Sequence, residues 1–273
     1  MFGWLTSAPP NPILLTLGAV QLRWYGVSLA LALLAGVMLA QHLAKRVGIA
    51  RERIVDLALV ATICAIVGAR LVHVLNDWTY YRMHLADIPQ LWKGGLAFHG
   101  VLLGGLLAAW LYARWKRLNV VLLADVLFPA LALGQVIGRW GNWFNQELYG
   151  RPTNVAWAIP IDPLHRLAGY EALTRFHPLF LYEMLGNAVI LGLLLYLWHR
   201  PVRQDGASGR PTRRTGDVAA AYLILSPSLR FGLDFLRLEQ PMIGPVTNAQ
   251  IFSILLILAG LALAFTRSRR PLH

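Results

Sequence analysis

The chain has 273 residues, of which 57% are hydrophobic and 14% are charged. This composition predicts an integral membrane protein and argues against a soluble domain. The formal net charge of +12 would suit a nucleic-acid-binding protein, but basic side chains that flank membrane spans explain it, and the sequence has no nucleic-acid-binding motif. Because Cys64 is the single cysteine, an intrachain disulfide and a cysteine-based metal site are excluded. The sequence has no convincing metal-ligand spacing, and we expect no metal or other cofactor.

Apolar runs of about 20 residues, long enough to cross a bilayer, predict an all-α integral membrane protein with a single domain over residues 1–273. We expect about seven transmembrane helices, at 24–43, 54–75, 97–113, 120–138, 179–198, 217–236 and 250–266. Residues 1–22 contain no Lys or Arg, so the basic start of a cleavable signal peptide is missing and the first span should be retained. Residues 79–93, rich in Trp and Tyr, predict an interfacial arm.

The positions of the 25 Lys and Arg residues predict the orientation of these spans. Loops on one side hold most of the basic residues, and the positive-inside rule places that side in the cytoplasm. The N-terminus is then outside and the C-terminus cytoplasmic. Residues 76–95 and 142–177 become small extracytoplasmic arm and head segments, and residues 199–216 a flexible cytoplasmic linker.

Polar side chains near the start of the chain each allow a structural and a functional reading. Arg23, Trp24 and Tyr25 open the first span, where interfacial anchoring explains them, although Tyr25 is also a candidate hydrogen-bonding group. Arg70 lies deep in the second span, at a cost that a partner or a water-filled cavity must offset. Glu183, Asp234 or a lipid phosphate are the possible partners of Arg70, and the sequence does not choose among them.

His99 opens the third span, within Gly94-Gly95-Leu96-Ala97-Phe98-His99-Gly100. A lone histidine near a membrane interface is more often structural. It is also the side chain whose ordinary pKa suits a general base near neutral pH. Farther along, Gly134 and Gly138 are four residues apart and predict a face that another helix approaches closely.

The end of the fourth span carries a dense group of polar side chains, from Gly138 to Gly150. Arg139 is costly if it faces lipid, so it should face a cavity, a partner or a bound anion. An interfacial anchor with snorkelling arginine and tryptophans is the alternative. Asn142, Asn145 and Glu147 favour the functional interpretation because an anchor has no use for amides and a carboxylate.

Two later spans also hold ionisable groups. Glu183 lies one turn into the fifth span, where we expect it to pair with a cation or to line a cavity. Arg230 and Asp234 are four residues apart on the sixth span, which also fits an ordinary intrahelical ion pair. Asp125, towards the other end of the fourth span, is predicted to be structural.

The run Gly138-Arg139-x-Gly141-Asn142-x-x-Asn145-x-Glu147-x-x-Gly150 resembles the signature of the prolipoprotein diacylglyceryl transferases, enzymes of the bacterial cytoplasmic (inner) membrane. Similar motifs occur at Arg23–Gly26, Gly68–Arg70, Gly94–Gly100, His177–Glu183, Arg230–Arg237 and Asn248–Gln250. The chain departs from the family where Ser226 replaces a tyrosine and Asp234 replaces a glutamate.

The resemblance implies transfer of the diacylglyceryl group of phosphatidylglycerol to the lipobox cysteine of preprolipoproteins, which forms a thioether and releases glycerol 1-phosphate. On this reading the partners are phosphatidylglycerol, the signal-peptide/lipobox segment and membrane lipids, and the active site faces the outer leaflet. Catalytic roles fall to His99, Arg139 and Arg230, because guanidinium groups bind phosphate oxygens and a histidine can take the thiol proton. Substrate-binding roles fall to Arg139, Asn142, Asn145, Glu147, Tyr25, Arg70, Glu183 and Asp234.

Two alternatives remain at this point. The same arginines would serve a transporter of an anionic solute or lipid, although no internal repeat of the kind found in many transporters is visible. Ser226 and Asp234 also allow a divergent relative of the transferase with altered activity.

Overall fold

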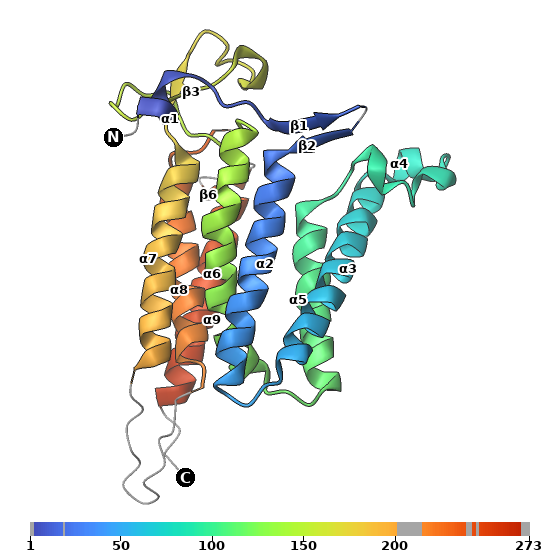
Figure 1. The fold of residues 1–273 in the computed structure, drawn as a ribbon, viewed down its shortest axis with the longest axis vertical. Coiled ribbons are helices and arrows are strands. Elements are labelled where there is room, and N and C mark those ends of the chain that lie inside the picture. The colour runs from blue at the N-terminus through green and yellow to red at the C-terminus, as the bar shows by residue number, and fades with distance from the viewer. Residues whose placement is uncertain (1–2, 19, 201–214, 239–241, 244–245, 269–273) are drawn as a thin grey trace, which may run out of the picture. The chain divides into compact units, whose positions relative to one another are not determined.

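The computed structural model describes residues 3–18, 20–200, 215–238, 242–243 and 246–268 (Figure 1). The chain divides into two compact units, which we treat separately. Unit 1 contains residues 1–39 and 124–273, and unit 2 contains residues 40–123. Residues 201–214, the body of the predicted cytoplasmic linker, lie outside the described part of the chain.

Long helices make up most of both units, and the regular elements run from blue to red along the chain in Figure 1. Helices α2 (Trp24–Lys45) and α6 (Val120–Phe144) carry the chain from one unit to the other. Unit 2 otherwise consists of α3 (Arg51–Asn76), α4 (Trp78–Tyr81), the short 3-10 helices η1 (Leu85–Asp87) and η2 (Leu91–Lys93), and α5 (Phe98–Trp115). Unit 1 adds α1 (Gly3–Ser7), η3 (Pro163–His165), α7 (Leu179–His199), α8 (Asp217–Asp234) and α9 (Asn248–Ser268).

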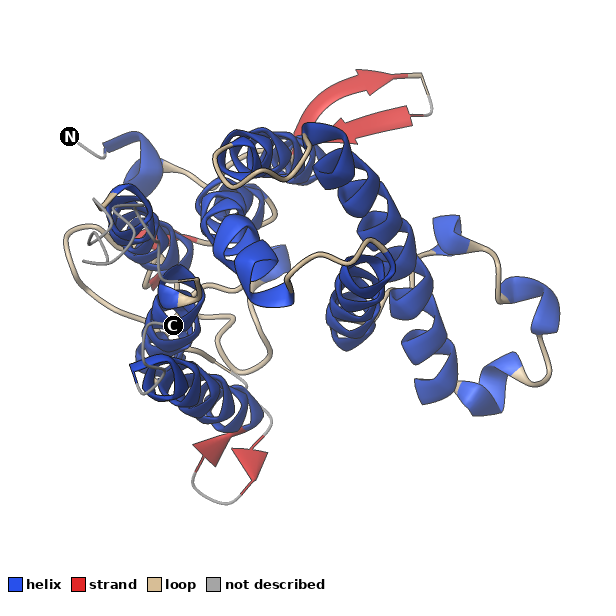
Figure 2. Ribbon diagram, turned by 90° about the horizontal axis from the view of Figure 1, so that it is seen from below, coloured by secondary structure: helices blue, strands red, loops and turns tan. Residues whose placement is uncertain are grey.

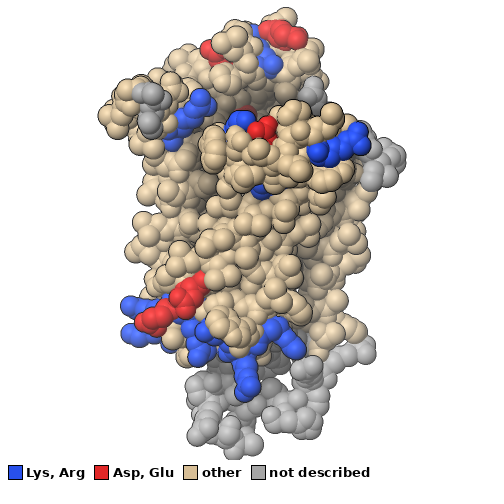
Figure 3. All heavy atoms as spheres, turned by 90° about the vertical axis from the view of Figure 1, so that its right-hand side faces the viewer, with Lys and Arg blue, Asp and Glu red and all other residues tan. Residues whose placement is uncertain are grey.

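The chain is a mostly helical membrane protein. Helices are present at all seven predicted positions, and among the described residues five of them, α2, α3, α6, α7 and α9, are long and apolar enough to cross a bilayer. Helix α8 falls short because it carries Asp217, Arg230 and Asp234, and α5 because His99 and Arg114 interrupt its apolar run. On the face of unit 2 that Figure 3 shows, charged side chains gather near the two ends and an uncharged band separates them.

The expectation of an all-α fold needs a correction, since three short antiparallel strand pairs accompany the helices in the described part of the chain (Figure 2). They pair β1 (Ile13–Leu17) with β2 (Val20–Arg23), β3 (Ile159–Pro160) with β4 (Arg175–Phe176), and β5 (Met242–Ile243) with β6 (Val246–Thr247). In the first hairpin Leu17 pairs with Val20, and Gly18 adopts a positive φ of 60° that suits the turn. Hairpins this short satisfy their backbone groups locally and leave little periodic signal in the sequence.

Residues 77–97, which include the region predicted to be an interfacial arm at 79–93, contain short helical turns in place of a membrane span. We call this segment the arm from here on. It follows α3 directly and leads into α5.

Close helix packing occurs at glycines other than those predicted. A Cβ added at Gly138 would meet nothing within 4 Å, and one at Gly134 would lie 3.8 Å from the Ala32 carbonyl oxygen. In unit 2, by contrast, a Cβ at Gly100 or Gly104 would come within 2.2 Å of carbonyl oxygens of α3. These two glycines are four residues apart on α5 and so let the backbones of α3 and α5 touch.

In unit 1, α8 packs against both α7 and α9. The connection between α6 and α7 forms a small core with the end of α6, built around Trp143, Tyr149, Ile159, Phe176 and Phe180. We call residues 145–178 the head segment. This core packs the head segment against the polar end of α6 and the start of α7.

Asp125 has the structural role expected of it. Its carboxylate is fully buried and accepts hydrogen bonds from the backbone N–H groups of Gly216 and Ala219. It therefore satisfies free donors at the start of α8, where a helix has no backbone acceptors of its own.

Candidate active site

Three arginines of unit 1 surround the carboxylate of Glu183. Glu183 lies one turn into α7 and is only 4% exposed. Its Oε2 forms a close ion pair with Nη2 of Arg139, and its Oε1 lies 2.6 Å from Nη2 of Arg237 and 3.6 Å from Nη1 of Arg230. The expected ion-pair role of Glu183 is confirmed, and one carboxylate holds guanidinium groups from α6, α8 and the residues after α8.

Arg139 also begins a chain of hydrogen bonds along the end of α6. Its Nη1 donates to Oδ1 of Asn142 at 3.0 Å, and Nδ2 of Asn142 donates to Oε1 of Glu147 at 2.8 Å. Asn142 is buried and Glu147 is exposed, so the chain leads from the buried cluster to the surface. Asn145 lies half-buried on the same turn.

Asp234 anchors Arg230 from the side away from Glu183. Its Oδ1 lies 3.3 Å from Nη2 of Arg230, and its Oδ2 accepts a short hydrogen bond from the Thr247 hydroxyl. Thr247 in turn precedes α9 and forms a reciprocal cap with Gln250, in which each backbone N–H donates to the other side chain at 3.0 Å. The shorter carboxylate therefore still reaches its arginine.

The cluster has more positive than negative charge and retains unused donors. The guanidinium groups of Arg139, Arg230 and Arg237 face two buried carboxylates, those of Glu183 and Asp234. Within the described residues, Nη1 of Arg230 and Nε of Arg237 are buried and make no hydrogen bond. A buried donor without an acceptor costs about 1–3 kcal/mol, so oxygen atoms of an anion would stabilise this arrangement.

Two signature glycines allow close approaches beside this cluster. A Cβ at Gly141 would lie 2.9 Å from Cδ2 of Tyr25, so the Tyr25 ring packs directly on the backbone of α6. A Cβ at Gly150 would lie 2.8 Å from Cβ of His177 and 3.0 Å from the Leu236 carbonyl oxygen. At Gly150 the head segment therefore passes closely by the chain that carries Arg237.

The sequence analysis assigned no site role to several residues of this cluster, although Arg237 and Gln250 lie in motifs that resemble the family's. Arg237 follows Arg230 and Asp234 at the i, i+4, i+7 spacing of one helix face, which could have identified it. Thr247 and Gln250 have the spacing of a capping box, another signal available in the sequence.

Gln146 was also missed, and its role depends on distant contacts. Its Oε1 accepts from the Asp162 backbone N–H at 2.7 Å, and its Nε2 donates to the Pro10 carbonyl at 3.3 Å. Gln146 is 5% exposed and adopts a positive φ of 53°. It thus ties the end of α6 to the head segment and to the N-terminal segment.

His177 ends the head segment in a partly buried hydrogen-bonded group. The Trp157 indole N–H donates to the Tyr182 hydroxyl at 2.7 Å, and that hydroxyl lies 3.1 Å from Nδ1 of His177. Burial lowers the pKa of His177 from its ordinary value of 6.5. The imidazole is accordingly neutral near pH 7 and able to accept the Tyr182 proton in a hydrogen bond.

Arg70 belongs to unit 2, and its partners differ from the two carboxylates considered from the sequence. Its Nε donates to the Ile88 carbonyl at 2.7 Å, and Nη1 donates to Gly94 and Gly95 at 2.7 and 3.1 Å. Its Nη2 donates to Asp87 and Gln90 at 2.6 and 3.4 Å. The acceptors are backbone carbonyls of the arm and not the carboxylates of Glu183 or Asp234. All five guanidinium N–H groups are used.

His99 lies at the start of α5, also in unit 2, and its side chain is exposed. Nearby in the arm, Asp87 accepts from the Tyr80 hydroxyl at 2.7 Å and lies 3.0 Å from Nζ of Lys93. The Tyr80 hydrogen bond, and then that of Lys93, lower the pKa of the Asp87 carboxyl. The structure therefore groups the predicted site residues Tyr25, Arg139, Asn142, Glu147, Glu183, Arg230 and Asp234 within unit 1, and Arg70 and His99 within unit 2.

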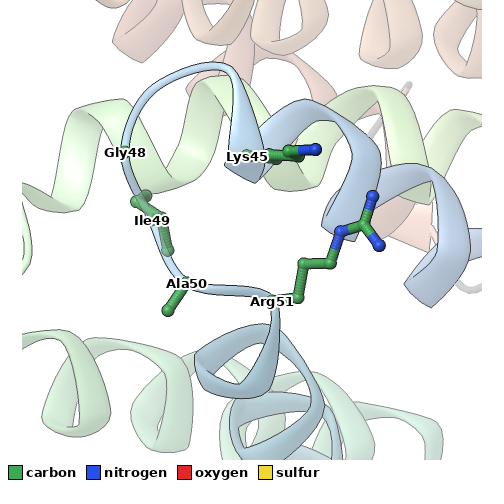
Figure 4. A pocket seen from close by; sticks show the side chains of 5 residues that line it. All are labelled: Lys45, Gly48, Ile49, Ala50 and Arg51. Carbon is green, nitrogen blue, oxygen red and sulfur yellow. The ribbon is translucent and has the colours of Figure 1, made fainter.

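A basic hollow occupies the other end of unit 2, where α2 connects to α3. It is lined by Lys45, Gly48, Ile49, Ala50 and Arg51 (Figure 4). Arg51 begins α3 and Arg70 lies near its end, which separates them by about 28 Å along the helix axis. The hollow is thus far from His99 and has none of the carboxylates or amides of the Glu183 cluster.

These features define a mostly helical membrane protein in which three arginines meet the buried carboxylate of Glu183. The family model of the prolipoprotein diacylglyceryl transferases matches residues 12–266. The chain belongs to this family.

Curated relatives agree over nearly the whole chain. A phosphatidylglycerol–prolipoprotein diacylglyceryl transferase of Trichormus variabilis is 40% identical over 266 residues, 96% of this chain and 92% of the relative. Those of Acaryochloris marina and Synechococcus elongatus are 39% and 41% identical, each over 258 residues and 94% of this chain, covering 91% and 87% of the relatives.

Proposed function

We propose that this chain transfers the diacylglyceryl group of phosphatidylglycerol to the lipobox cysteine of preprolipoproteins, the first step of bacterial lipoprotein maturation. Diacylglyceryl transfer is the activity of its family. The observation that supports the mechanism is the meeting of three arginines at the single buried carboxylate of Glu183. With the carboxylate of Asp234 also counted, the described groups of this cluster carry three positive and two negative charges, and a phosphodiester would add one negative charge.

Arg139 and Arg230 hold the phosphate in this mechanism. Their side chains are 23% and 28% exposed, whereas that of Glu183 is 5% exposed, and Nη1 of Arg230 is a buried donor without a hydrogen-bond acceptor in the described residues. Paired, charge-assisted hydrogen bonds from guanidinium to phosphate oxygens are the strong form of this contact. Glu183 and Asp234 then fix the direction of the arginines.

The groups around Arg139 orient the rest of the lipid head group. Asn142 and Glu147 continue its hydrogen-bond chain towards the surface, where the glycerol hydroxyls of phosphatidylglycerol offer both donors and acceptors. Asn145, on the same turn, and Tyr25, packed on Gly141, complete this set.

The reaction is a nucleophilic displacement at the C3 carbon of the diacylglyceryl group. A general base takes the proton of the cysteine thiol, whose ordinary pKa of about 8.5 leaves it mostly protonated at neutral pH, and the family resemblance assigns this role to His99. The thiolate sulfur forms a bond to C3 while the C3–O bond breaks, and the electron pair of that bond leaves with glycerol 1-phosphate. Arg139 and Arg230 stabilise the charge that develops on the leaving phosphate.

The membrane arrangement belongs to the same proposal. Seven spans, with α5 and α8 added to the five apolar helices, place the N-terminus outside and the C-terminus in the cytoplasm. The arm and the head segment are then extracytoplasmic, residues 199–216 are cytoplasmic, and the Glu183 cluster faces the outer leaflet of the cytoplasmic membrane.

Purified protein in mixed micelles, given phosphatidylglycerol labelled in its diacylglyceryl group and a lipobox peptide, tests the proposal by mass spectrometry of the thioether product. We expect product from the unaltered chain and a loss of about a hundredfold or more in Arg139→Ala and Arg230→Ala. Arg53→Ala, an exposed arginine at the start of α3, is the matched control and should retain activity.

The same purified protein, reconstituted into proteoliposomes, distinguishes the alternatives. Uptake of labelled glycerol phosphate into proteoliposomes, without thioether product, would support an anionic-solute transporter and refute the transferase. Folded protein that gives neither product nor uptake would indicate a divergent relative. The contact between Asp234 and Arg230 argues against that last outcome, because the ion pair survives the shorter side chain.

A further inference from the structure

The guanidinium group of Arg70 donates five hydrogen bonds to backbone carbonyls of the arm, and this arrangement indicates a role for Arg70 other than substrate binding. We propose that Arg70 is a positioning residue, which clamps residues 87–95 of the arm and thereby fixes His99 at the start of α5. This inference rests on the catalytic role proposed for His99.

The geometry of the clamp requires a guanidinium group. Arg70 is 5% exposed, and its carbonyl acceptors come from two parts of the arm, residues 87–90 and residues 94–95. The planar fork with five donors reaches both parts at once, whereas a lysine ammonium has three donors on a flexible stem. Tyr81 covers the group, with its ring centroid 5.2 Å from Cζ of Arg70.

The loop that Arg70 holds packs closely against α3. Gly94 and Gly95 adopt positive φ values of 83° and 76°, a conformation that favours glycine. A Cβ at Gly95 would lie 2.8 Å from Nη1 of Arg70 and 2.3 Å from Nε2 of His73. Only a residue without a side chain allows the loop to approach α3 this closely.

The clamp continues directly into the helix that carries His99. The Ala97 N–H donates to the Ala69 carbonyl at 3.0 Å, and a Cβ at Gly100 would lie 2.2 Å from the Gly68 carbonyl oxygen. Three consecutive residues of α3, 68–70, thus contact the chain at positions 94–95, 97 and 100. His99 lies between two of these contacts, so its backbone position follows from them.

This arrangement also explains why Arg70 does not itself bind substrate. Its five N–H groups already have acceptors, so a lipid phosphate would have to displace carbonyls of the arm. The residue therefore acts on the reaction through His99.

Hydrogen exchange of the purified full-length chain in micelles tests the clamp without reference to activity. In Arg70→Lys, amides of residues 94–101 should exchange about a hundredfold faster, because at least two charge-assisted hydrogen bonds are lost. Arg82→Lys, an exposed arginine of the same arm, is the matched control and should leave exchange unchanged. Unchanged exchange in Arg70→Lys would overturn the clamp.

Gly95→Ala provides a second route if Arg70→Lys fails to fold, since it disturbs the clamp from the loop and leaves α3 intact. Gly105→Ala is its control, because an added Cβ there meets nothing closer than 3.9 Å. Gly95→Ala should accelerate exchange at residues 94–101, and Gly105→Ala should not. Protection that survives in Gly95→Ala would also overturn the clamp.

Transfer kinetics test the link to His99. Arg70→Lys should lower kcat about tenfold and leave KM for phosphatidylglycerol nearly unchanged, because the proposed phosphate ligands are other arginines. In a His99→Ala background, Arg70→Lys should lower kcat little further, since both changes remove the same function. Fast exchange with unchanged kcat would overturn the positioning role. Transferase inactivity of the unaltered chain would instead refute the proposed function, while the exchange results still decide the clamp.

Discussion

The charge of Glu183 is the most informative feature to remove, because three arginines depend on it. Glu183→Gln keeps the shape of the side chain but replaces one carboxylate oxygen by an NH₂ group that faces guanidinium donors. Oε2 pairs with Arg139 and Oε1 with Arg237 and Arg230, so either orientation of the amide loses at least one pair. Removing one partner from a buried ion pair costs about 3–5 kcal/mol, and we expect a loss of stability of this size.

The effect on the reaction follows from the same contacts. Without the carboxylate, Arg139 and Arg230 lose the group that directs them towards the phosphate, and kcat/KM should decrease about a hundredfold or more. Thermal unfolding in detergent measures the stability change, and thioether formation at varied phosphatidylglycerol concentration measures the kinetic change. Glu52→Gln, the same replacement at an exposed position of α3, is the control.

One result would refute this reasoning. If Glu183→Gln lowered KM for phosphatidylglycerol and kept kcat, the carboxylate would compete with the phosphate for the arginines instead of positioning them. If the unfolding temperature also stayed unchanged, the ion pairs would contribute nothing to the fold.

Three further predictions concern the surroundings of this cluster. Thr247→Val removes the hydroxyl that donates to buried Asp234, so it should lower the free energy of unfolding by about 1–3 kcal/mol and also lower transfer activity. Thr247→Ser keeps a hydroxyl and should restore both the stability and the activity. Equal behaviour of the two variants would contradict this prediction. Gly150→Ala should destabilise the chain by about 1–3 kcal/mol, because its Cβ would lie 2.8 Å from that of His177; an unchanged unfolding temperature would show that the head segment yields easily. Burial holds the pKa of His177 below 6.5, so the unfolded chain binds this proton first and stability decreases as pH falls below 6.5 towards the lower, folded-state pKa. His177→Asn should reduce the difference in unfolding temperature between about pH 7.5 and pH 5.5, and an unaltered difference would assign it to other groups.

The helical framework was largely predictable from the sequence. Apolar runs of membrane-spanning length and the aromatic arm depend on composition and local periodicity, and helices are found at each predicted position. The hairpins were not predicted, because strands of two to five residues have too few positions to establish an alternating pattern. The close contact between α3 and α5 was also missed, although Gly100 and Gly104 have the same spacing as Gly134 and Gly138. Spacing identifies a possible contact face, but the rotation of each helix decides whether a neighbour uses it.

The sequence by itself determined which residue types the site contains. Arg139, Asn142, Glu147, Glu183 and Arg230 are costly in an apolar environment unless they are paired, and their motifs resemble those of one family, so their involvement could be inferred without coordinates.

Only the tertiary structure decided which donor meets which acceptor. Arg70 and Arg237 both follow apolar stretches, yet Arg70 binds five carbonyls of the arm and Arg237 binds Glu183. A guanidinium group has five N–H donors on a long side chain, and it donates to carbonyl and carboxylate oxygens alike. Its role therefore depends on which acceptors the folded chain brings within reach, and local sequence does not contain that information.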